Sequence, residues 1–226
     1  DFCYPDGEEA VLKDISFTAK AGETLAIIGS TGSGKSTLIQ LIPRFYDVTG
    51  GRVLINGVDV RQMNSHELRE HIGFVAQKAN LFSGTIEENI RFGREDATDE
   101  EVRHAAEIAQ AMDFIMDKPN GFQEKIVEGA GNLSGGQKQR LSITRALVRK
   151  PDIYIYDDSF SALDMKTDAV LRQALKSEVK NAVVIIVAQR VSTIMDADQI
   201  LALDEGRLAA MGRHKELLKE CPLYYE

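Results

Sequence analysis

Short runs of apolar, often β-branched residues alternate with helical patterns along most of the chain. Strands are predicted where such runs lie between polar segments: Leu25–Gly29, Arg52–Ile55, Ile72–Val75, Ile153–Tyr156, Val183–Val187 and Gln199–Leu203. A helical period predicts helices over Lys35–Ile42, Ser65–His71, Asp99–Ala111, Gly135–Arg149, Thr167–Val179 and His214–Lys219. Because buried apolar strands lie between helices, the pattern predicts an α/β fold with a mainly parallel core sheet.

Two regions depart from this alternation. Near the N-terminus, Val11–Thr18 and Arg52–Val60 look like antiparallel strands, with Asn56–Gly57 as a hairpin turn, so we expect an antiparallel β-subdomain there. Residues 79–149 are helical with no strong strand. We therefore expect one domain over residues 1–226, in which a helical subdomain at 79–149 interrupts a core formed by 1–78 and 150–226.

Composition agrees with a soluble, globular protein. Of the 226 residues, 43% are hydrophobic and 27% are charged, and the formal net charge of −8 argues against nonspecific binding to DNA or to an anionic membrane. The longest apolar run, Ala182 to Ala188, is far shorter than the ~20 residues that span a bilayer. Cys3 and Cys221 lie in no metal-ligand spacing, which favours structural roles in a reducing compartment. Since the chain starts at Asp1 and not at Met, we expect it to belong to a longer protein.

A glycine-rich segment between the first predicted strand and helix carries the strongest chemical signal. Residues 29–36 match G-x-x-x-x-G-K-[ST] in the strand–loop–helix context that this motif requires. Glycines let backbone N–H groups curl toward phosphate oxygens, and the helix N-terminus adds positive charge. Lys35 is expected at the β- and γ-phosphates and Ser36 at Mg²⁺. The predicted nucleotide-binding residues of this loop are Gly29, Ser30, Thr31, Gly32, Ser33, Gly34, Lys35, Ser36 and Thr37.

A second Mg²⁺ ligand is expected at the end of another apolar strand. Asp157 follows Ile153–Tyr156 directly. An aspartate after an apolar strand is a weak signal by itself, because many strands end in this way. Together with the phosphate loop, it indicates a carboxylate that binds the metal of a nucleoside triphosphate.

Between these motifs stands the segment Leu133-Ser134-Gly135-Gly136-Gln137, and here the sequence resembles the ATP-binding cassette (ABC) family, whose signature motif is LSGGQ. The resemblance covers nearly the whole chain. Gln77 matches the glutamine of the family's Q-loop, which implies a nucleotide-binding residue and Mg²⁺ ligand, and Ser161–Asp164 matches its D-loop. Tyr4 falls where the family places an aromatic residue that stacks on adenine. The resemblance implies a P-loop ABC-ATPase fold and the cofactors ATP and Mg²⁺.

The signature also implies a partner. Ser134, Gly135, Gly136 and Gln137 begin the long helix, where backbone N–H groups, a hydroxyl and the helix dipole suit a γ-phosphate. In the family this surface faces the phosphate loop of a second cassette, so that ATP lies between two nucleotide-binding domains.

The segments Leu81–Ile86 and Leu41–Asp47 resemble the exporter branch of the family. This implies transmembrane domains as partners and a location at the cytoplasmic face of a plasma or inner membrane. It implies neither a nucleic-acid partner nor membrane insertion by this chain. Glu128 sits where exporters carry a loop that touches the membrane domain, but its neighbours differ here, and a solvated acidic loop is a nearly equal interpretation.

Two positions depart from the family pattern. The family's catalytic glutamate is Asp158 here, and its switch histidine is Gln189. An aspartate is shorter by about 1 Å, and a displacement of that size can reduce a rate by about 10²-fold. A glutamine donates a hydrogen bond but cannot titrate or become cationic. With Lys35, Asp158 and Gln189 as the catalytic positions, we expect a site that binds ATP and hydrolyses it poorly.

The paired change resembles the degenerate half of a heterodimeric exporter, whose intact LSGGQ would complete the partner's competent site. One alternative is an active homodimeric exporter with slow hydrolysis. Another is a soluble ABC ATPase that acts on DNA or ribosomes, but such proteins carry long inserts or a second cassette. Only 99 positions separate Gly34 from Leu133 here (133 − 34), without heptads.

Overall fold

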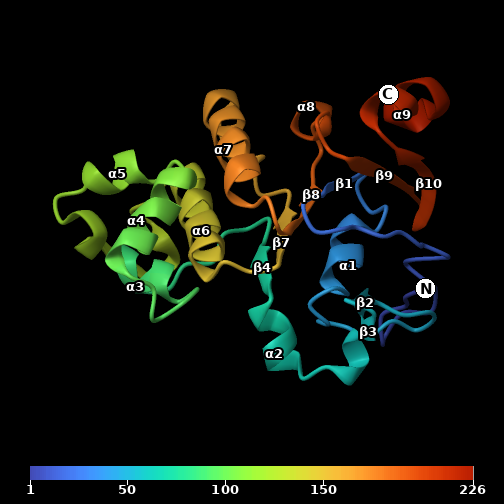
Figure 1. The fold of residues 1–226 in the computed structure, drawn as a ribbon, viewed down its shortest axis with the longest axis horizontal. Helices are drawn as coiled ribbons and strands as arrows, with labels where there is room; N and C mark the ends of the chain where they lie inside the picture. The colour runs from blue at the N-terminus through green and yellow to red at the C-terminus, as the bar shows by residue number, and fades with distance from the viewer. Residues whose placement is uncertain (226) are drawn as a thin grey trace.

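The computed structural model describes residues 1–225, and a six-stranded sheet lies at its centre (Figure 1). The order of the strands is β10-β9-β1-β8-β7-β4. All neighbouring pairs are parallel except β9 and β10, so the prediction of a mainly parallel core is confirmed. The strands are β1 (Thr24–Gly29), β4 (Ile72–Val75), β7 (Ile153–Asp157), β8 (Val183–Val187), β9 (Gln199–Asp204) and β10 (Arg207–Gly212).

Both faces of this sheet are covered, which explains why its strands read as nearly continuous apolar runs. Successive side chains point to opposite faces. Leu25, Ile27 and Ile155 belong to one buried cluster with residues of α1 (Lys35–Gln40). The alternate residues face α6 (Gly135–Arg149) and α7 (Met165–Glu178) in a second cluster. In Figure 1, α1 lies below the sheet and α7 above it.

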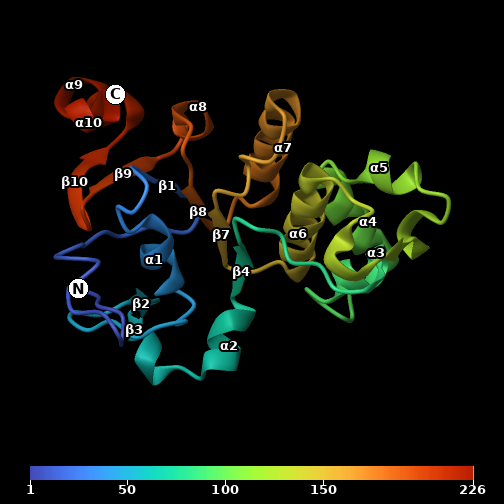
Figure 2. The ribbon, with the colours of Figure 1, turned by 180° about the vertical axis from the view of Figure 1, so that it is seen from behind.

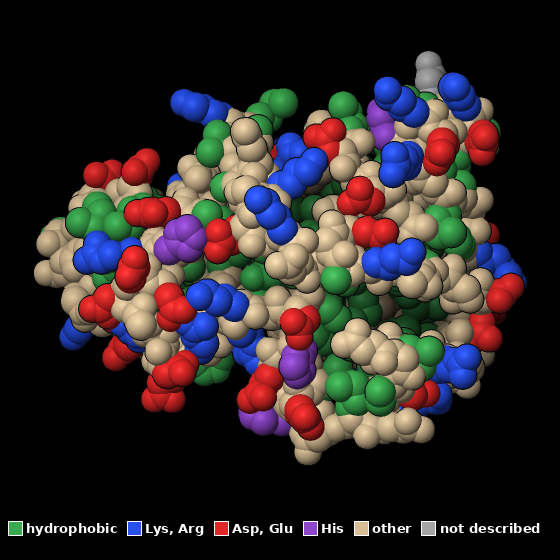
Figure 3. Space-filling model, viewed as in Figure 1, with side chains coloured by type: hydrophobic (Ala, Val, Ile, Leu, Met, Phe, Trp, Pro, Cys, Tyr) green, Lys and Arg blue, Asp and Glu red, His purple; other side chains and the backbone are tan. Residues whose placement is uncertain are grey.

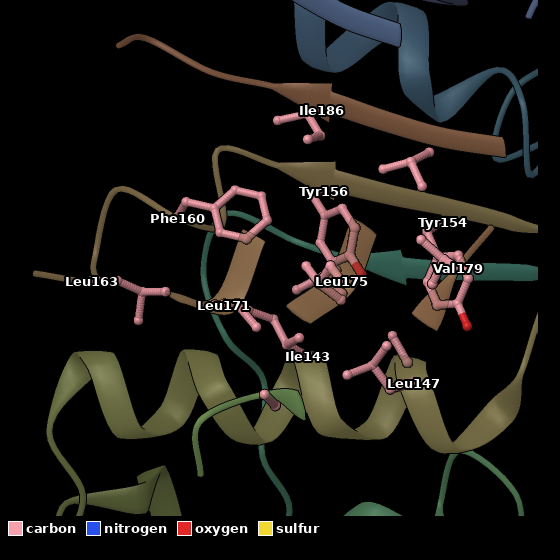
Figure 4. Packing of buried hydrophobic residues seen from close by; sticks show 14 of the residues in the cluster. Ile143, Leu147, Tyr154, Tyr156, Phe160, Leu163, Leu171, Leu175, Val179 and Ile186 are labelled. Atoms are coloured by element: carbon pink, nitrogen blue, oxygen red, sulfur yellow. The ribbon is translucent and has the colours of Figure 1, made fainter. Parts of the chain in front are cut away.

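Figure 4 shows the second cluster from close by. Tyr154 and Tyr156 of β7 stack with 6.2 Å between ring centroids and face Leu175 of α7 and Ile143 of α6. Fully burying an aliphatic or aromatic side chain of this size stabilises a fold by roughly 1.5–3 kcal/mol. The contacts therefore fix the helix that carries the signature motif to the strand that ends in Asp157.

The helices agree with the predicted pattern, with shifted ends. α7 starts at Met165, earlier than predicted, because the Asp164 carboxylate accepts hydrogen bonds from the N–H groups of Lys166 and Thr167. The predicted helix Asp99–Ala111 ends at Ile108, and Gln110 has a left-handed φ of 56° before the next helix. The remaining helices are α2 (Ser65–Glu70), α3 (Ile86–Arg91), α4 (Asp99–Ile108), α5 (Met112–Met116), α8 (Val191–Ile194), α9 (His214–Glu220) and α10 (Pro222–Tyr225), with 3₁₀ turns at Val60–Gln62, Gly121–Gln123 and Glu128–Ala130.

The predicted N-terminal β-subdomain is much smaller than expected. Only β2 (Leu54–Ile55) and β3 (Val58–Asp59) pair, across a turn in which Asn56 and Gly57 have φ values of 50° and 80°, as a type I′ hairpin requires. The prediction of a strand over Val11–Thr18 is wrong. This segment makes a single bridge, from Leu12 to Phe2, and the left-handed φ of 51° at Asp14 then turns the backbone away.

The helices α3, α4, α5 and α6 gather on one side of the molecule, on the left in Figure 1 and on the right in Figure 2. Two short strands, β5 (Gly84–Thr85) and β6 (Lys125–Ile126), pair within this region. None of the helices in residues 1–225 has the length and apolar character needed to cross a bilayer.

Candidate nucleotide-binding site

The core sheet brings the predicted site residues to one edge. The phosphate loop follows β1, Gln77 follows β4, Asp157 ends β7 and Gln189 follows β8. Because parallel strands end at the same edge of a sheet, segments that are far apart in sequence meet there, and α/β proteins bind ligands at this edge. The candidate site is therefore built mainly by four strands of the sheet.

The phosphate loop is shaped by glycines at two close approaches. A Cβ atom on Gly29 would lie 2.3 Å from the carbonyl oxygen of Leu203 in β9, so this position has no room for a side chain. Gly34 caps α1 with a left-handed φ of 98°, which L-residues rarely adopt. The backbone can consequently turn sharply between strand and helix, as a phosphate-binding loop requires.

Lys35 lies over this loop. Its Nζ donates hydrogen bonds to the carbonyl oxygens of Gly29 and Ser30, both at 2.7 Å. Burial lowers the pKa of Lys35, and the nearby carboxylates of Asp157 and Asp158 oppose this effect. The ammonium group is thus placed above the loop, where it can exchange carbonyl oxygens for phosphate oxygens.

Two of the three predicted Mg²⁺ ligands, Ser36 and Asp157, are in direct contact. The hydroxyl of Ser36 donates to Oδ1 of Asp157 over 3.0 Å, and burial raises the pKa of Asp157. Within the described part of the chain, no group of three or more His, Cys, Asp or Glu residues could hold a metal. Mg²⁺ typically binds one or two protein oxygens together with water and phosphate oxygens, so this sparse pair of ligands fits it.

Asp158 is the centre of a small polar network. Its Oδ2 accepts hydrogen bonds from Nε2 of Gln77 at 3.2 Å and from Nε2 of Gln189 at 3.0 Å. The residue is 8% exposed, and burial raises the pKa of its carboxyl group. The structure therefore brings together the two positions that depart from the family pattern and joins them to the predicted Q-loop glutamine.

Tyr4 lies beside the helix that follows the phosphate loop. Its hydroxyl shares a hydrogen bond of 2.9 Å with Oγ1 of Thr37, and its ring packs edge-on against Phe2 and Tyr46. These contacts place a half-buried aromatic ring near the start of α1. Its role in stacking on adenine stays a prediction.

The signature segment is exposed at Ser134 and Gly135 and lies away from the phosphate loop. Ser134 caps α6, with its hydroxyl accepting from the Gln137 N–H at 3.2 Å and the Gln137 side chain accepting from the Ser134 N–H at 3.0 Å. Ser134 and Gly135 are solvent-exposed. A Cβ on Gly136 would lie 3.3 Å from the carbonyl oxygen of Ala162, so the signature adjoins the predicted D-loop. Figures 1 and 2 place α6 and α1 in different parts of the molecule.

One residue of functional interest escaped the sequence prediction. Gln139, on the core-facing side of α6, is 2% exposed and donates from Nε2 to the carbonyl oxygen of Ala76 at 3.0 Å. Ala76 directly precedes Gln77, so Gln139 ties the signature helix to the Q-loop. The available signal was a polar residue four positions before Ile143, on the apolar face of the predicted helix.

Comparison with protein families agrees with this geometry. Residues 12–161 match the family described as ABC transporter. The chain is 46% identical over 228 residues to an uncharacterized ABC transporter ATP-binding protein of Mycobacterium tuberculosis, with all of the chain and 39% of that protein covered. It is 47% identical over 223 residues to a putative multidrug export ATP-binding/permease protein of Staphylococcus aureus, covering 99% of the chain and 39% of the relative.

A solved structure described as a bacterial Atm1-family ABC exporter with ATP bound is similar as well. It has a TM-score of 0.95 and 41% sequence identity, and the match covers 99% of this chain and 39% of that one. The chain thus spans 39% of the length of each of these relatives.

Proposed function

The chain belongs to the ABC transporter family, and we propose that it is the ATP-binding domain of an exporter, dimerising with a second such domain when ATP binds. The S. aureus relative is described as a putative multidrug export protein and the similar structure as an exporter, which supports the direction of transport. The remainder of the protein would supply the transmembrane domains, which places this domain at the cytoplasmic face of a plasma or inner membrane.

The position of the signature supports the dimer. Ser134 and Gly135 are exposed at the N-terminus of a 15-residue helix, and the positive end of a helix dipole suits an anion. The phosphate loop of the same chain lies between β1 and α1, in a different part of the molecule from α6 (Figure 2). A second nucleotide-binding domain would bring its own phosphate loop and ATP to this surface, and the signature would then complete the partner's site.

Within this chain's own site, some residues would bind Mg²⁺ and the phosphates, and others would take part in hydrolysis. Ser36, Asp157 and Gln77 would hold Mg²⁺, which neutralises charge on the phosphate oxygens. Lys35 would bind the β- and γ-phosphates. Asp158 stands where a base would orient the attacking water, and Gln189 would donate a hydrogen bond to the γ-phosphate.

We propose that hydrolysis at this site is weak, and the position of the Asp158 carboxylate is the observation that carries the proposal. Its backbone is fixed on both sides, since its N–H donates to the carbonyl oxygen of Val187 at 3.0 Å and its carbonyl oxygen accepts from the Ser161 hydroxyl at 2.8 Å. Its side chain is one methylene shorter than glutamate and is held by two amide groups. It cannot advance toward a water as a glutamate would, and Gln189 cannot take up a proton.

The partner would then be a non-identical domain with a competent site, which this chain's intact LSGGQ would complete. A homodimeric exporter with slow hydrolysis is the second candidate, because burial raises the pKa of Asp158 and a raised pKa suits a general base. ATP hydrolysis by this chain alone, with no second kind of domain present, would favour the second candidate.

A nucleic-acid-directed ABC ATPase fits less well. The formal net charge is −8, and the face in Figure 3 mixes acidic with basic side chains. Nucleic-acid binding depends on clustered Lys and Arg residues along one surface.

The decisive experiment restores both family residues in the complete transporter. Asp158→Glu combined with Gln189→His should raise ATP hydrolysis at this site by about 10²-fold, the factor expected for correcting a displacement of about 1 Å. Turnover is measured with the partner's own catalytic acid substituted, so that only this site contributes. Adding Lys35→Ala to the restored protein is the control that should abolish the gain. An unchanged rate in the restored protein would refute the proposal of a degenerate site.

A further inference from the structure

We propose that Asp158 is a positioning residue that fixes the side-chain amide of Gln77, so that its carbonyl oxygen is the atom available to Mg²⁺. The inference rests on the proposed function, in which Gln77 is a metal ligand. It goes further because Asp158, at the family's catalytic position, would also orient a ligand of the metal.

The sheet order places the three side chains together. β7 lies between β4 and β8, with Val75 opposite Tyr156 and Asp157 opposite Val187. Gln77 comes two residues after β4, and Gln189 comes two residues after β8. Asp158 directly follows the middle strand, so a glutamine from each neighbouring strand reaches it.

The chemistry of the carboxylate decides how each amide is oriented. An ionised carboxylate only accepts hydrogen bonds, so each glutamine must present its NH₂ group to Oδ2. For Gln77 this leaves Oε1 as the free acceptor, and an amide oxygen is a suitable ligand for a hard cation. A side chain that orients a metal ligand through a hydrogen bond affects metal affinity by about 10–100-fold when it is removed.

Asp158 is itself held firmly enough to do this. Its φ of 47° is left-handed, and its N–H and carbonyl groups are both bonded, to Val187 and Ser161. The adjacent Ser159 donates from Oγ to the carbonyl oxygen of Val75, the last residue of β4. The backbone that carries the carboxylate is thus bonded to the ends of β8 and β4, on either side of β7.

The test measures binding without hydrolysis, in the full 226-residue chain. The probe is the ATP analogue with an imido group between the β- and γ-phosphorus atoms, titrated once with Mg²⁺ and once with EDTA. The ratio of the two dissociation constants reports the contribution of the metal and cancels any change common to both titrations. Asp158→Gly removes the carboxylate and suits the left-handed φ. Asp158→Asn is the second variant, because asparagine also tolerates this conformation and remains as a folded comparison.

Asp158→Gly should reduce the Mg²⁺ contribution by about 10-fold, with a smaller reduction in Asp158→Asn, whose neutral oxygen still accepts. In a Gln77→Ala background, which removes the ligand itself, Asp158→Gly should have no further effect. An equal reduction in both backgrounds would mean that Asp158 acts on the metal without Gln77, and no reduction would mean that it does not act at all. Either result overturns the inference and leaves the proposed function standing. If Mg²⁺ fails to raise affinity in the unsubstituted chain, the proposed metal site falls as well.

Discussion

Replacing Gln139 by methionine should remove the hydrogen bond between the signature helix and the Q-loop. Gln139 is 2% exposed in the interior face of α6, and its amide donates to the carbonyl oxygen of Ala76. Methionine has a similar volume and a high helix propensity but no donor, so Gln139→Met removes this hydrogen bond with little change in packing.

The donor of this bond is buried, but Ala76, which carries the acceptor, is solvent-exposed. A neutral hydrogen bond contributes about 0.5–1.5 kcal/mol, and water can bind the exposed carbonyl oxygen once the donor is removed. We therefore expect Gln139→Met to reduce the free energy of unfolding by about 1 kcal/mol. For a domain of this size, that corresponds to a decrease in Tm of about 2–4 °C.

Urea and thermal unfolding followed by circular dichroism measure the effect. Gln173→Met is the matched control, because Gln173 is also helical, in α7, but is solvent-exposed and has no side-chain partner within residues 1–225. The control should stay within ~0.5 kcal/mol of the unsubstituted chain. If Gln139→Met behaves like Gln173→Met, the link between α6 and the Q-loop does not contribute to stability, and the reasoning fails.

Two further outcomes concern the scaffold around the site. Gly206→Ala should destabilise the chain by well over 1 kcal/mol, because its Cβ would lie 2.0 Å from the carbonyl oxygen of Val11, whereas Gly51→Ala has nearly the same φ but nothing within 4 Å among the described residues. Equal urea midpoints for these two variants would contradict this. The contact of Glu101 with the guanidinium of Arg94 lowers the pKa of Glu101 from 4.5 to about 2. Its stabilisation is therefore present above pH 4.5 and lost as the pH falls toward 2, so the stability difference between the unsubstituted chain and Glu101→Gln should shrink over that range. A difference that is constant between pH 5 and pH 3 would argue against the ion pair.

The core of the fold was predictable because its physical signal is local. Buried parallel strands have apolar residues on both faces, and each predicted core strand appears in the sheet within a residue or two of its expected ends. β10 was missed because it lies at the edge of the sheet and alternates between exposed and half-buried residues. Val11–Thr18 has a similar composition to a strand, yet the turn at Asp14 removes it from any ladder. Whether a segment finds a pairing partner is a property of the whole chain.

The site was predictable at the level of residues and not at the level of contacts. The phosphate loop and Asp157 carry motifs, and the structure joins Ser36 to Asp157 as expected for two Mg²⁺ ligands. Nothing in the sequence says that Gln77 and Gln189 meet on one oxygen atom. That contact depends on β4 and β8 being the two neighbours of β7, and strand order is not written in any local pattern.

This strand order also gives a reason why the two departures from the family pattern occur together. Asp158 and Gln189 are hydrogen-bonded to each other, and Asp158 as a residue is 8% exposed. A buried carboxylate requires hydrogen-bond donors. The donor from Gln189 lies within hydrogen-bond distance of an aspartate oxygen, and a longer acid would place its oxygen at a different distance from the same donor. Exchanging only one of the two residues would leave a mismatched or unsatisfied pair in a site that also contains Lys35 and the phosphate loop. Changing both retains a satisfied network at the strand ends, while under the proposed function the longer acid and the titratable group are absent together. A site altered in this way can remain ordered and bind nucleotide, which is the property that a non-hydrolysing half of a dimer needs.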